Sequence, residues 1–401
     1  MLIHNDIYNM ISIAQAISTV KANTNALMKT TIKTVEKAGG YILSKDIKSP
    51  INMPPFNQSA MDGYALSLHE SNTYRLMGEI QAGDEHQPIL KPGEAYRIFT
   101  GAAVPKTANA VVMQEKVTVE KLLIKIEGDV SINQNIRPLG EQVKYDDLAL
   151  KKGTKLTPAA IGFLASLGIT TVSVYKKPSI AIITTGNELV EPGTNLKYGK
   201  IYESNSKMLL SALYNLKFYD INLYNVADNY GRTVAQLKTA INENDLVIIT
   251  GGISVGDYDF VGRALTELHV EELFYKVKQK PGKPLFYGKK GATQVFALPG
   301  NPAAALTCFY VYVHIALQQM MNREDLELKR VSAKSATHFL KKGDRPQFLK
   351  AIYNNGEVEI LEGQSSAMQQ TFALANALVF MDENAQEITI GKTVETIILP
   401  E

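Results

Sequence analysis

Acidic residues follow three short apolar runs of this sequence, in the loop after each run. The runs SIAIIT, INLYNV and LVIIT precede Glu188, Asp228 and the pair Asp257 and Asp259, respectively. Carboxylates that meet at one rim repel each other unless a cation lies between them, and oxygen ligands suit a hard ion such as Mg2+. We therefore expect Glu188, Asp228 and Asp259 to bind Mg2+. Taken singly, each acid is interpreted equally well as a helix N-cap or first-turn residue.

Two glycine-containing loops have the composition of anion-binding loops. Gly251, Gly252 and Gly256 surround Ser254, and glycine allows backbone N–H groups to approach an oxyanion closely. The segment LPGNP, residues 298–302, supplies an N-cap Asn and a first-position Pro for a helix. These loops indicate a phosphate or another anion without specifying which.

A basic run lies between these two loops. Lys276, Lys278 and Lys280 alternate, which predicts that they share one face of a strand, and Lys283 follows in KPGKP. A solvated edge strand protected by lysines is the alternative interpretation. The prolines and glycine of KPGKP favour a fixed turn that holds Lys280 and Lys283 in an electropositive site.

The segment GISVG, residues 252–256, also matches the nucleophile elbow of serine hydrolases, in the expected strand-to-helix position. Asp259 and His269 follow Ser254 in the order required for a triad. A serine hydrolase is therefore an alternative. It explains neither the lysine run nor the earlier acids, and a histidine only ten positions after the aspartate fits triad geometry poorly.

The segments between the apolar runs determine where these residues lie. Helical patterns at 204–219 and 230–242 separate the runs, which predicts a doubly wound, mostly parallel sheet with all strand C-termini at one edge. Ligands of such sheets bind outside that edge. Residues 302–321 are uncharged and about long enough to span a bilayer, but the polar side chains within them favour a buried helix.

The rest of the chain predicts a multidomain protein. A small β domain with frequent turn residues is expected as an insertion in a mixed helix and strand domain, whose first helices begin at Ser12 and pass through Ile32. Period-two alternation predicts a C-terminal domain similar to a β-barrel. The expected domains are residues 1–52 with 138–177 (mixed), 53–137 (inserted β), 178–323 (α/β) and 324–401 (C-terminal β).

Composition limits the functional classes. The 401 residues are 45% hydrophobic and 20% charged, as in ordinary globular proteins, and the net charge of +2 provides no long-range attraction to nucleic acid. The single cysteine, Cys308, excludes a disulfide framework and a thiolate metal site. The first residues lack the basic start of a signal peptide. We expect a cytoplasmic protein that binds neither nucleic acid nor membrane.

Short motifs along nearly the whole chain resemble, in order, those of the molybdopterin molybdenumtransferase family (MoeA and the E domain of gephyrin). The motifs are SAMDGYA (59–65), FTGAAVP (99–105), VVMQE (111–115), RPLGE (137–141), LTPAAIGFLASLGI (156–169), TTGNEL (184–189), GGISVGDYDF (251–260), KPGKP (280–284) and LPGNP (298–302). Each motif is weak by itself, and their ordered succession is specific.

The resemblance implies four domains and an elongated homodimer, whose active cleft lies between the parallel-sheet domain of one subunit and the inserted β domain of the other. It also implies the last step of molybdenum cofactor synthesis. Adenylated molybdopterin and molybdate are bound, the adenylate is cleaved with Mg2+, and molybdenum is placed on the pterin dithiolene. An upstream adenylyltransferase and a downstream molybdoenzyme are the implied protein partners.

The resemblance assigns roles to individual positions. The catalytic residues that it implies are Asp62, Thr100, Glu188, Asp228, Asp259, Lys276 and Lys280, with Glu188, Asp228 and Asp259 as metal ligands. The substrate-binding residues are Arg137, Gly186, Gly251, Gly252, Ser254, Gly256, Lys283, Pro299, Pro302, Arg345 and Ser366.

Gln142 departs from the family pattern, because an acidic residue usually follows RPLGE. The carboxylate there would come from Glu141, or the site would work with one charge fewer. Tungstate is nearly equal to molybdate in size and charge, and the sequence does not distinguish the two. A dimeric scaffold without turnover, as gephyrin also provides, is the second alternative to the transferase.

Overall fold

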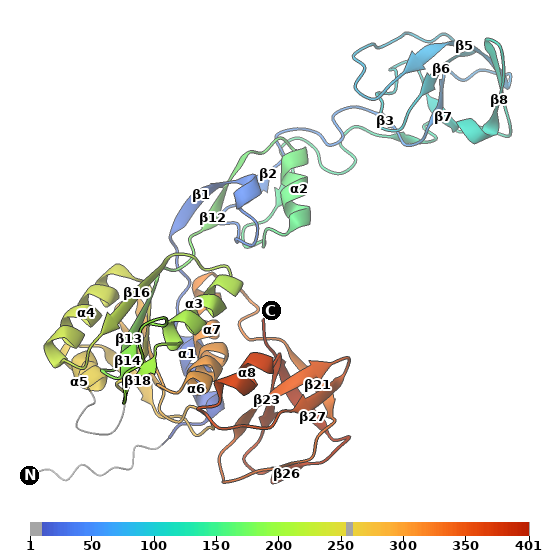
Figure 1. Ribbon diagram of the computed structural model, residues 1–401. Coiled ribbons are helices and arrows are strands. Elements are labelled where there is room, and N and C mark those ends of the chain that lie inside the picture. Colours follow the sequence, from blue (N-terminus) through green and yellow to red (C-terminus); the bar gives the residue numbers. More distant parts are fainter. Residues whose placement is uncertain (1–9, 254–259, 401) are drawn as a thin grey trace, which may run out of the picture. The chain divides into compact units, whose positions relative to one another are not determined.

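The computed structural model describes residues 10–253 and 260–400, and the chain divides into two compact units (Figure 1). One unit comprises Met1–Thr31 and Tyr175–Glu401, and the other comprises Ile32–Val174. The larger unit contains the predicted α/β domain and the C-terminal β domain. The smaller unit contains the predicted inserted β domain.

The α/β part of the larger unit is built on a six-stranded sheet in the order β16-β13-β17-β20-β19-β18. The strands β16, β13, β17 and β20 are parallel, whereas β19 is antiparallel to both β20 and β18. A mostly parallel sheet is therefore confirmed. The strands are β13 (Ile180–Thr185), β16 (Ile221–Val226), β17 (Leu246–Thr250), β18 (Glu271–Tyr275), β19 (Phe286–Lys290) and β20 (Thr293–Leu298).

Helices cover both faces of this sheet (Figure 1). Successive residues of a strand point to opposite faces, and Ile182 packs with α1, α3, α6 and α7 while Ile183 packs with α4 and α5. Both side chains are almost completely buried, which stabilises the fold by about 1.5–3 kcal/mol each. The helices are α1 (Ile13–Asn23), α3 (Asn205–Asn215), α4 (Tyr230–Glu243), α5 (Phe260–Glu267), α6 (Pro302–Cys308) and α7 (His314–Met320).

Local signals set several of these helix ends. Ser12 begins α1 with the predicted capping box, in which Ser12 Oγ accepts from Gln15 N and Gln15 Oε1 accepts from Ser12 N. Helix α3 ends at Asn215, four residues before the predicted end. Lys217 adopts a positive φ of 65° there, and its N–H donates to Tyr214 O, which turns the chain out of the helix.

The apolar segment after Pro302 lies in the core. Helix α6 passes through a π-helical turn, Phe309–Val313, into α7, and Cys308, Tyr312 and Ala316 are fully buried. The buried-helix interpretation is thus confirmed. In the part of the chain that the structure describes, no helix combines the length and apolar character needed to cross a membrane.

The C-terminal part of the larger unit is a closed barrel in the order β21-β24-β23-β25-β27. Its interior contains Leu349, Ala351 and Val379, all nearly inaccessible to solvent. This confirms the predicted barrel-like domain. The elements are β21 (Arg330–Ser335), β22 (Phe339–Leu340), β23 (Gln347–Asn354), β24 (Glu357–Ile360), α8 (Gln369–Leu374), β25 (Ala377–Met381), β26 (Glu387–Ile388) and β27 (Thr393–Ile398).

The smaller unit contains a second six-stranded sheet, in the order β7-β4-β6-β5-β9-β8. Its strands are β4 (Gly63–Leu66), β5 (Thr73–Ile80), β6 (Glu94–Ile98), β7 (Ala110–Met113), β8 (Val117–Glu120) and β9 (Leu123–Ile126). Shorter elements complete the unit: β1 (Thr30–Thr34), η1 (Val35–Lys37), β2 (Ile47–Lys48), β3 (Gln58–Ser59), η2 (Gln114–Lys116), β10 (Ile136–Arg137), β11 (Leu148–Leu150), α2 (Pro158–Ser166) and β12 (Thr171–Tyr175).

The helix predicted through Ile32 is wrong. Residues 30–34 (TTIKT) form strand β1, which pairs with β12, and only the short 3-10 turn η1 follows. Four of the five residues of β1 are β-branched, and such side chains fit a pleated strand better than a helix.

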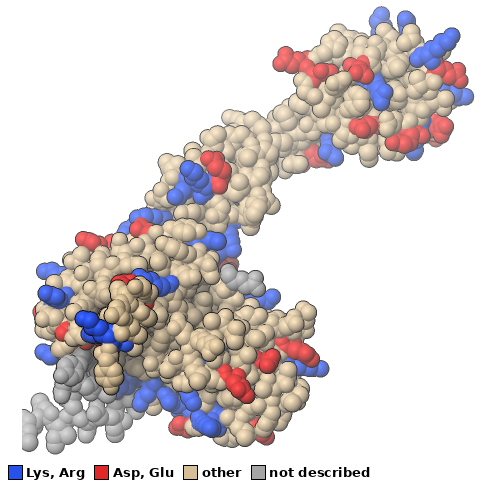
Figure 2. Space-filling model, viewed as in Figure 1, with Lys and Arg blue, Asp and Glu red and all other residues tan. Residues whose placement is uncertain are grey.

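Charged side chains of both signs are interspersed on the visible face of each unit (Figure 2). This agrees with the small net charge of +2. A large field of one sign, of the kind that attracts nucleic acid, is not apparent on that face.

Candidate functional site

The loops that follow the parallel strands meet at one edge of the sheet. In the order of the sheet they begin at Ala227 after β16, Gly186 after β13, Gly251 after β17 and Pro299 after β20. Strand β18 runs parallel to β20, so its C-terminal residue Tyr275 lies at the same edge. The predicted gathering of strand-end loops is confirmed for these described residues.

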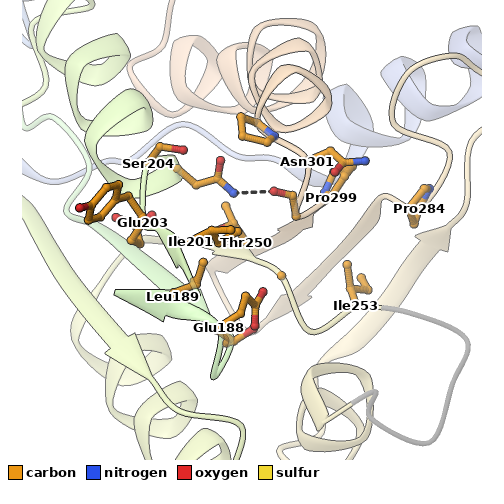
Figure 3. A pocket seen from close by; sticks show the side chains of 16 residues that line it. Glu188, Leu189, Ile201, Glu203, Ser204, Thr250, Ile253, Pro284, Pro299 and Asn301 are labelled. Carbon is orange, nitrogen blue, oxygen red and sulfur yellow. Dashed lines mark hydrogen bonds between the residues drawn. The ribbon is translucent and has the colours of Figure 1, made fainter. Parts of the chain in front are cut away.

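A cavity of about 390 Å3 lies between these loops (Figure 3). Four predicted site residues line it, namely Glu188, Gly251, Pro299 and Pro302. The other lining residues are Thr185, Leu189, Ile201, Tyr202, Glu203, Ser204, Asn205, Thr250, Ile253, Pro284, Gly300 and Asn301. They come from β13, from β14 (Leu189–Val190) and β15 (Ile201–Tyr202), from the end of β17, from the start of α3 and α6, and from the loops between these elements.

Two glycines allow the β13 and β17 ends to approach each other. A Cβ on Gly251 would lie 2.6 Å from Thr185 O, and one on Gly252 would lie 2.7 Å from Thr185 Oγ1. Both glycines have positive φ, 83° and 63°. Thr185 Oγ1 is buried and has no hydrogen-bond partner among the described residues. Of these two glycines, Gly251 lines the cavity and Gly252 does not.

Asn187 ties the loop that carries Glu188 to Asp228, and neither Asn187 nor Asp228 is among the residues that line the cavity. Its N–H donates to Asp228 Oδ2 at 3.0 Å, and its Oδ1 accepts from Asp228 N at 3.0 Å. The carboxylate of the adjacent Glu188 folds back over Gly186, where a Cβ would lie 2.7 Å from Glu188 Oε2. Glu188 is exposed and Asp228 is half-buried.

The sequence reasoning missed a second group of cavity residues, which precede and begin α3. Glu203 is 2% exposed and accepts hydrogen bonds from Ser206 N at 2.8 Å and Ser206 Oγ at 2.5 Å. Asn205 Nδ2 donates to Gly300 O at 2.8 Å, which ties α3 to the LPGNP loop (Figure 3). The segment ESN before a helical pattern was the available signal, because Glu, Ser and Asn favour helix starts.

The KPGKP turn is held from beneath by a buried polar cluster. Gln279 is fully buried; its Nε2 donates to Gly282 O at 3.0 Å, and its Oε1 accepts from Tyr312 Oη. Cys308 Sγ lies under Gly282, and burial raises the pKa of the Cys308 thiol to about 12, so it stays protonated. This assigns Cys308 to the core, as predicted.

The prediction that three alternating lysines share one strand face needs correction. Strand β18 ends at Tyr275, and Lys276 adopts a positive φ of 70°, which takes it out of the strand. Lys278 pairs with Glu383 at 2.5 Å, and that partner raises the pKa of Lys278. Lys280 and Lys283 remain on the fixed turn that the prolines predict.

The barrel contributes to the same neighbourhood. Arg345 Nη1 donates to Gln279 O at 2.9 Å, and Lys280 N donates to Pro346 O at 2.9 Å. Asn301 Nδ2 donates to Ser366 Oγ at 3.1 Å. Arg345 and Ser366 therefore lie beside KPGKP and LPGNP, respectively.

Three predicted site residues belong to the smaller unit. Asp62 and Thr100 lie side by side there, because Asp62 Oδ1 accepts from Thr100 N and from Thr100 Oγ1, both at 2.7 Å. These hydrogen bonds, the backbone one first, hold the pKa of Asp62 below its usual range. Arg137 is exposed at the end of β10, and Gln142 is exposed in the loop that follows.

Ser254, Gly256 and Asp259 lie outside the described residues, so both the third metal ligand and the nucleophile of the elbow are predictions only. His269 is exposed beyond the C-terminus of α5. An eight-residue helix spans about 12 Å, which separates His269 from the start of α5 by more than a hydrogen bond can bridge. Among the described residues, no cluster of three His, Cys, Asp or Glu side chains could bind a metal.

Three family models match consecutive parts of the chain. They are the MoeA N-terminal region (domain I and II) at residues 11–168, a probable molybdopterin binding domain at 181–319, and the MoeA C-terminal region (domain IV) at 332–399. The middle match coincides with the sheet that carries the cavity.

Curated relatives and solved structures agree with these matches. A molybdopterin molybdenumtransferase of Haemophilus influenzae is 34% identical over 96% of this chain and 98% of its own length. One of Staphylococcus aureus is 30% identical over 97% of this chain and 96% of its own. The crystal structure of the molybdopterin biosynthesis protein MoeA of Pyrococcus horikoshii covers 97% of this chain and 100% of its own, with a TM-score of 0.83 and 30% identity.

Proposed function

Because the chain belongs to the MoeA family of molybdopterin molybdenumtransferases, we propose that it inserts molybdenum from molybdate into adenylated molybdopterin and releases AMP. One observation supports this most directly. The cavity at the strand ends of the probable molybdopterin binding domain adjoins a turn and a barrel edge that carry Lys280, Arg345 and Ser366. In this proposal, the cavity is the pterin site and the adjoining turn and barrel edge form the oxyanion site.

The chemistry of the turn and barrel edge suits a tetrahedral dianion. Molybdate presents four acceptor oxygens, and ammonium, guanidinium and hydroxyl groups are the donors that bind such oxygens best. Lys280, Lys283, Arg345 and Ser366 provide these donors on segments that hydrogen-bond to one another or to LPGNP. Cleavage of the adenylate needs positioned cations and a metal ion more than a covalent nucleophile.

Mg2+ is the cofactor that we propose for this site, with Glu188, Asp228 and Asp259 as ligands. The donor set fits, because carboxylate oxygens are what Mg2+ prefers and Asn187 holds Asp228 next to the Glu188 loop. When bound, the ion neutralises charge on the phosphate oxygens. The residues of the chain orient the substrates: Glu188 lines the cavity, and Asn205 fixes the LPGNP loop opposite it.

We further propose a cytoplasmic homodimer in which Asp62, Thr100 and Arg137 complete the site of the other subunit. The family to which the chain belongs is the support for this arrangement, and hydrogen bonds from Thr100 fix the direction of the Asp62 carboxylate. An upstream adenylyltransferase supplies the substrate, and a downstream molybdoenzyme receives the product. A serine hydrolase is disfavoured by the position of His269 beyond α5.

The proposal is tested by replacing the lysine of the turn. Lys280→Ala should raise the molybdate concentration for half-maximal AMP release at least tenfold, because an ammonium that contacts an oxyanion contributes about 1.5–3 kcal/mol. Lys238→Ala, an exposed lysine on α4, is the matched control and should behave as the wild type. Unchanged molybdate dependence in Lys280→Ala would contradict the assigned role.

A further inference from the structure

Lys350 in strand β23 is a buried lysine that contacts the loop bearing Ser366. Its side chain is 4% exposed, and its ammonium donates to three backbone oxygens: Gly363 O at 2.8 Å, Ser365 O at 3.1 Å and Met368 O at 3.1 Å. An ammonium has three N–H donors, so these acceptors use its full capacity. None of the described carboxylates forms an ion pair with it.

The same strand position holds the loop through its backbone as well. Lys350 N donates to Gln364 Oε1 and Lys350 O accepts from Gln364 Nε2, both at 2.9 Å. The loop is tightly folded, because a Cβ on Gly363 would lie 2.6 Å from Thr371 Oγ1 and 2.7 Å from Met368 Sδ. Residues 363–368 are thereby fixed on both sides of Ser366.

This loop delivers Ser366 to the end of the LPGNP segment. Ser366 Oγ accepts from Asn301 Nδ2 at 3.1 Å, and Asn301 lines the cavity. The Ser365 carbonyl that binds Lys350 belongs to the peptide whose N–H is that of Ser366, so the ammonium acts one peptide away from the hydroxyl. A displaced carbonyl would rotate this peptide and move the hydroxyl.

Burial of an unpaired cation is costly, and desolvation lowers the pKa of Lys350. An apolar residue of the same length would fill the space without this cost. The lysine is therefore better explained by what its hydrogen bonds hold in place than by the stability of the barrel.

We propose that Lys350 is a positioning residue of the oxyanion site, which holds residues 363–368 so that the Ser366 hydroxyl stays beside Asn301. This inference rests on the proposed function, in which Ser366 contacts molybdate. It concerns a side chain that itself touches no substrate.

The experiment compares Lys350→Met, which keeps length and removes the three donors, with Lys350→Arg and with the exposed barrel residue Lys334→Met as control. In Lys350→Met we expect at least a tenfold rise in the molybdate concentration for half-maximal turnover, with less than a twofold change for adenylated molybdopterin. Lys350→Arg should restore part of the loss. Ser366→Ala should add little to Lys350→Met, because both changes remove the same contact.

Hydrogen exchange provides a readout that does not depend on turnover. Amides of residues 363–368 should exchange at least tenfold faster in Lys350→Met, while those of β25 and β27 stay as in the wild type. Equal acceleration throughout the barrel, or a Lys350→Met variant with wild-type exchange and molybdate dependence, would overturn the inference.

Different results would refute the proposed function and the positioning role of Lys350. Wild-type protein without molybdate-dependent turnover would refute the proposed function, and faster exchange confined to residues 363–368 would still support the positioning of the loop by Lys350. If Lys350→Met does not fold, Lys350→Gln decides, because its two amide N–H donors cannot satisfy all three carbonyls. Lys350→Gln should then raise the molybdate requirement and speed the exchange of residues 363–368, and wild-type values for both exchange and turnover would refute the inference.

Discussion

Substitution of Gly282 by alanine tests how the KPGKP turn is packed. Gly282 has a positive φ of 85°, and a Cβ there would lie 2.5 Å from Cys308 Sγ and 2.9 Å from Gln279 Nε2. Both neighbours are fully buried, and protein interiors are close-packed, so a shift of either side chain is costly. Alanine must therefore displace the turn that carries Lys280 and Lys283.

The expected loss of stability in Gly282→Ala is the sum of two free-energy costs. A left-handed backbone conformation costs alanine about 1–2 kcal/mol relative to glycine. Overpacking in a close-packed interior costs about 1–3 kcal/mol more. Gly282→Ala should therefore lower the free energy of unfolding of the larger unit by about 2–5 kcal/mol, and the displaced turn should also raise the molybdate requirement.

Urea unfolding of matched variants separates the two costs. Gly291→Ala is the control, because Gly291 has a φ of 60° and a Cβ there would meet no atom within 4 Å. It should lose only the backbone part, about 1–2 kcal/mol. Cys308→Ala removes the obstructing sulfur and should cost about 1 kcal/mol by itself, since it deletes roughly one methylene equivalent of buried volume.

The double variant Gly282→Ala with Cys308→Ala should be more stable than the sum of the single effects predicts, by about 1–3 kcal/mol, because the overpacking is relieved. If Gly282→Ala is no less stable than Gly291→Ala, the close contact does not exist. If the single effects add without coupling, the sulfur is not the obstacle.

Three further predictions concern pH, the cavity and the elbow. Burial is the largest cause that lowers the pKa of His314 from 6.5 to about 4. As the pH falls, the unfolded chain therefore binds a proton at His314 before the folded chain does. The contribution of neutral His314 to the free energy of unfolding is complete above pH 6.5 and is lost as the pH falls to 4. This contribution amounts to about 3 kcal/mol. Unfolding measured at several pH values should show that the free energy of unfolding depends less on pH in His314→Gln than in the wild type. Asn205→Ala loses the bond to Gly300 and should raise the KM for adenylated molybdopterin about fivefold in steady-state assays, with an unchanged KM counting against this role. Asp259→Asn should abolish AMP release while Ser254→Ala retains it, and the opposite result would favour the hydrolase.

The sequence predicted the sheet because its physical signal is local and repeated. Continuous apolar runs such as residues 246–250 are required when both faces of a strand are covered, and Ile248 and Ile249 do lie in opposite cores. Strand β1 was missed because the helical spacing of Ile32, Val35 and Glu36 was given more weight than the preference of β-branched residues for strands.

The candidate site was predicted as far as it follows strand ends and fixed turns. Glu188, Gly251 and Pro299 were found because strand topology alone brings them to one edge. Asn205 and Lys350 were missed because their roles depend on which distant backbone oxygens they meet. Such contacts arise from tertiary packing, and no spacing along the chain encodes them.

The most direct test of the account is incubation of the purified protein with adenylated molybdopterin, Mg2+ and molybdate, with AMP release and metal-bound pterin followed together. The account predicts that both products form and that both require Mg2+ and molybdate. Binding of the adenylated pterin without cleavage would direct attention to Gln142, where the family usually has an acid. Absence of binding would contradict the assigned activity and favour the scaffold.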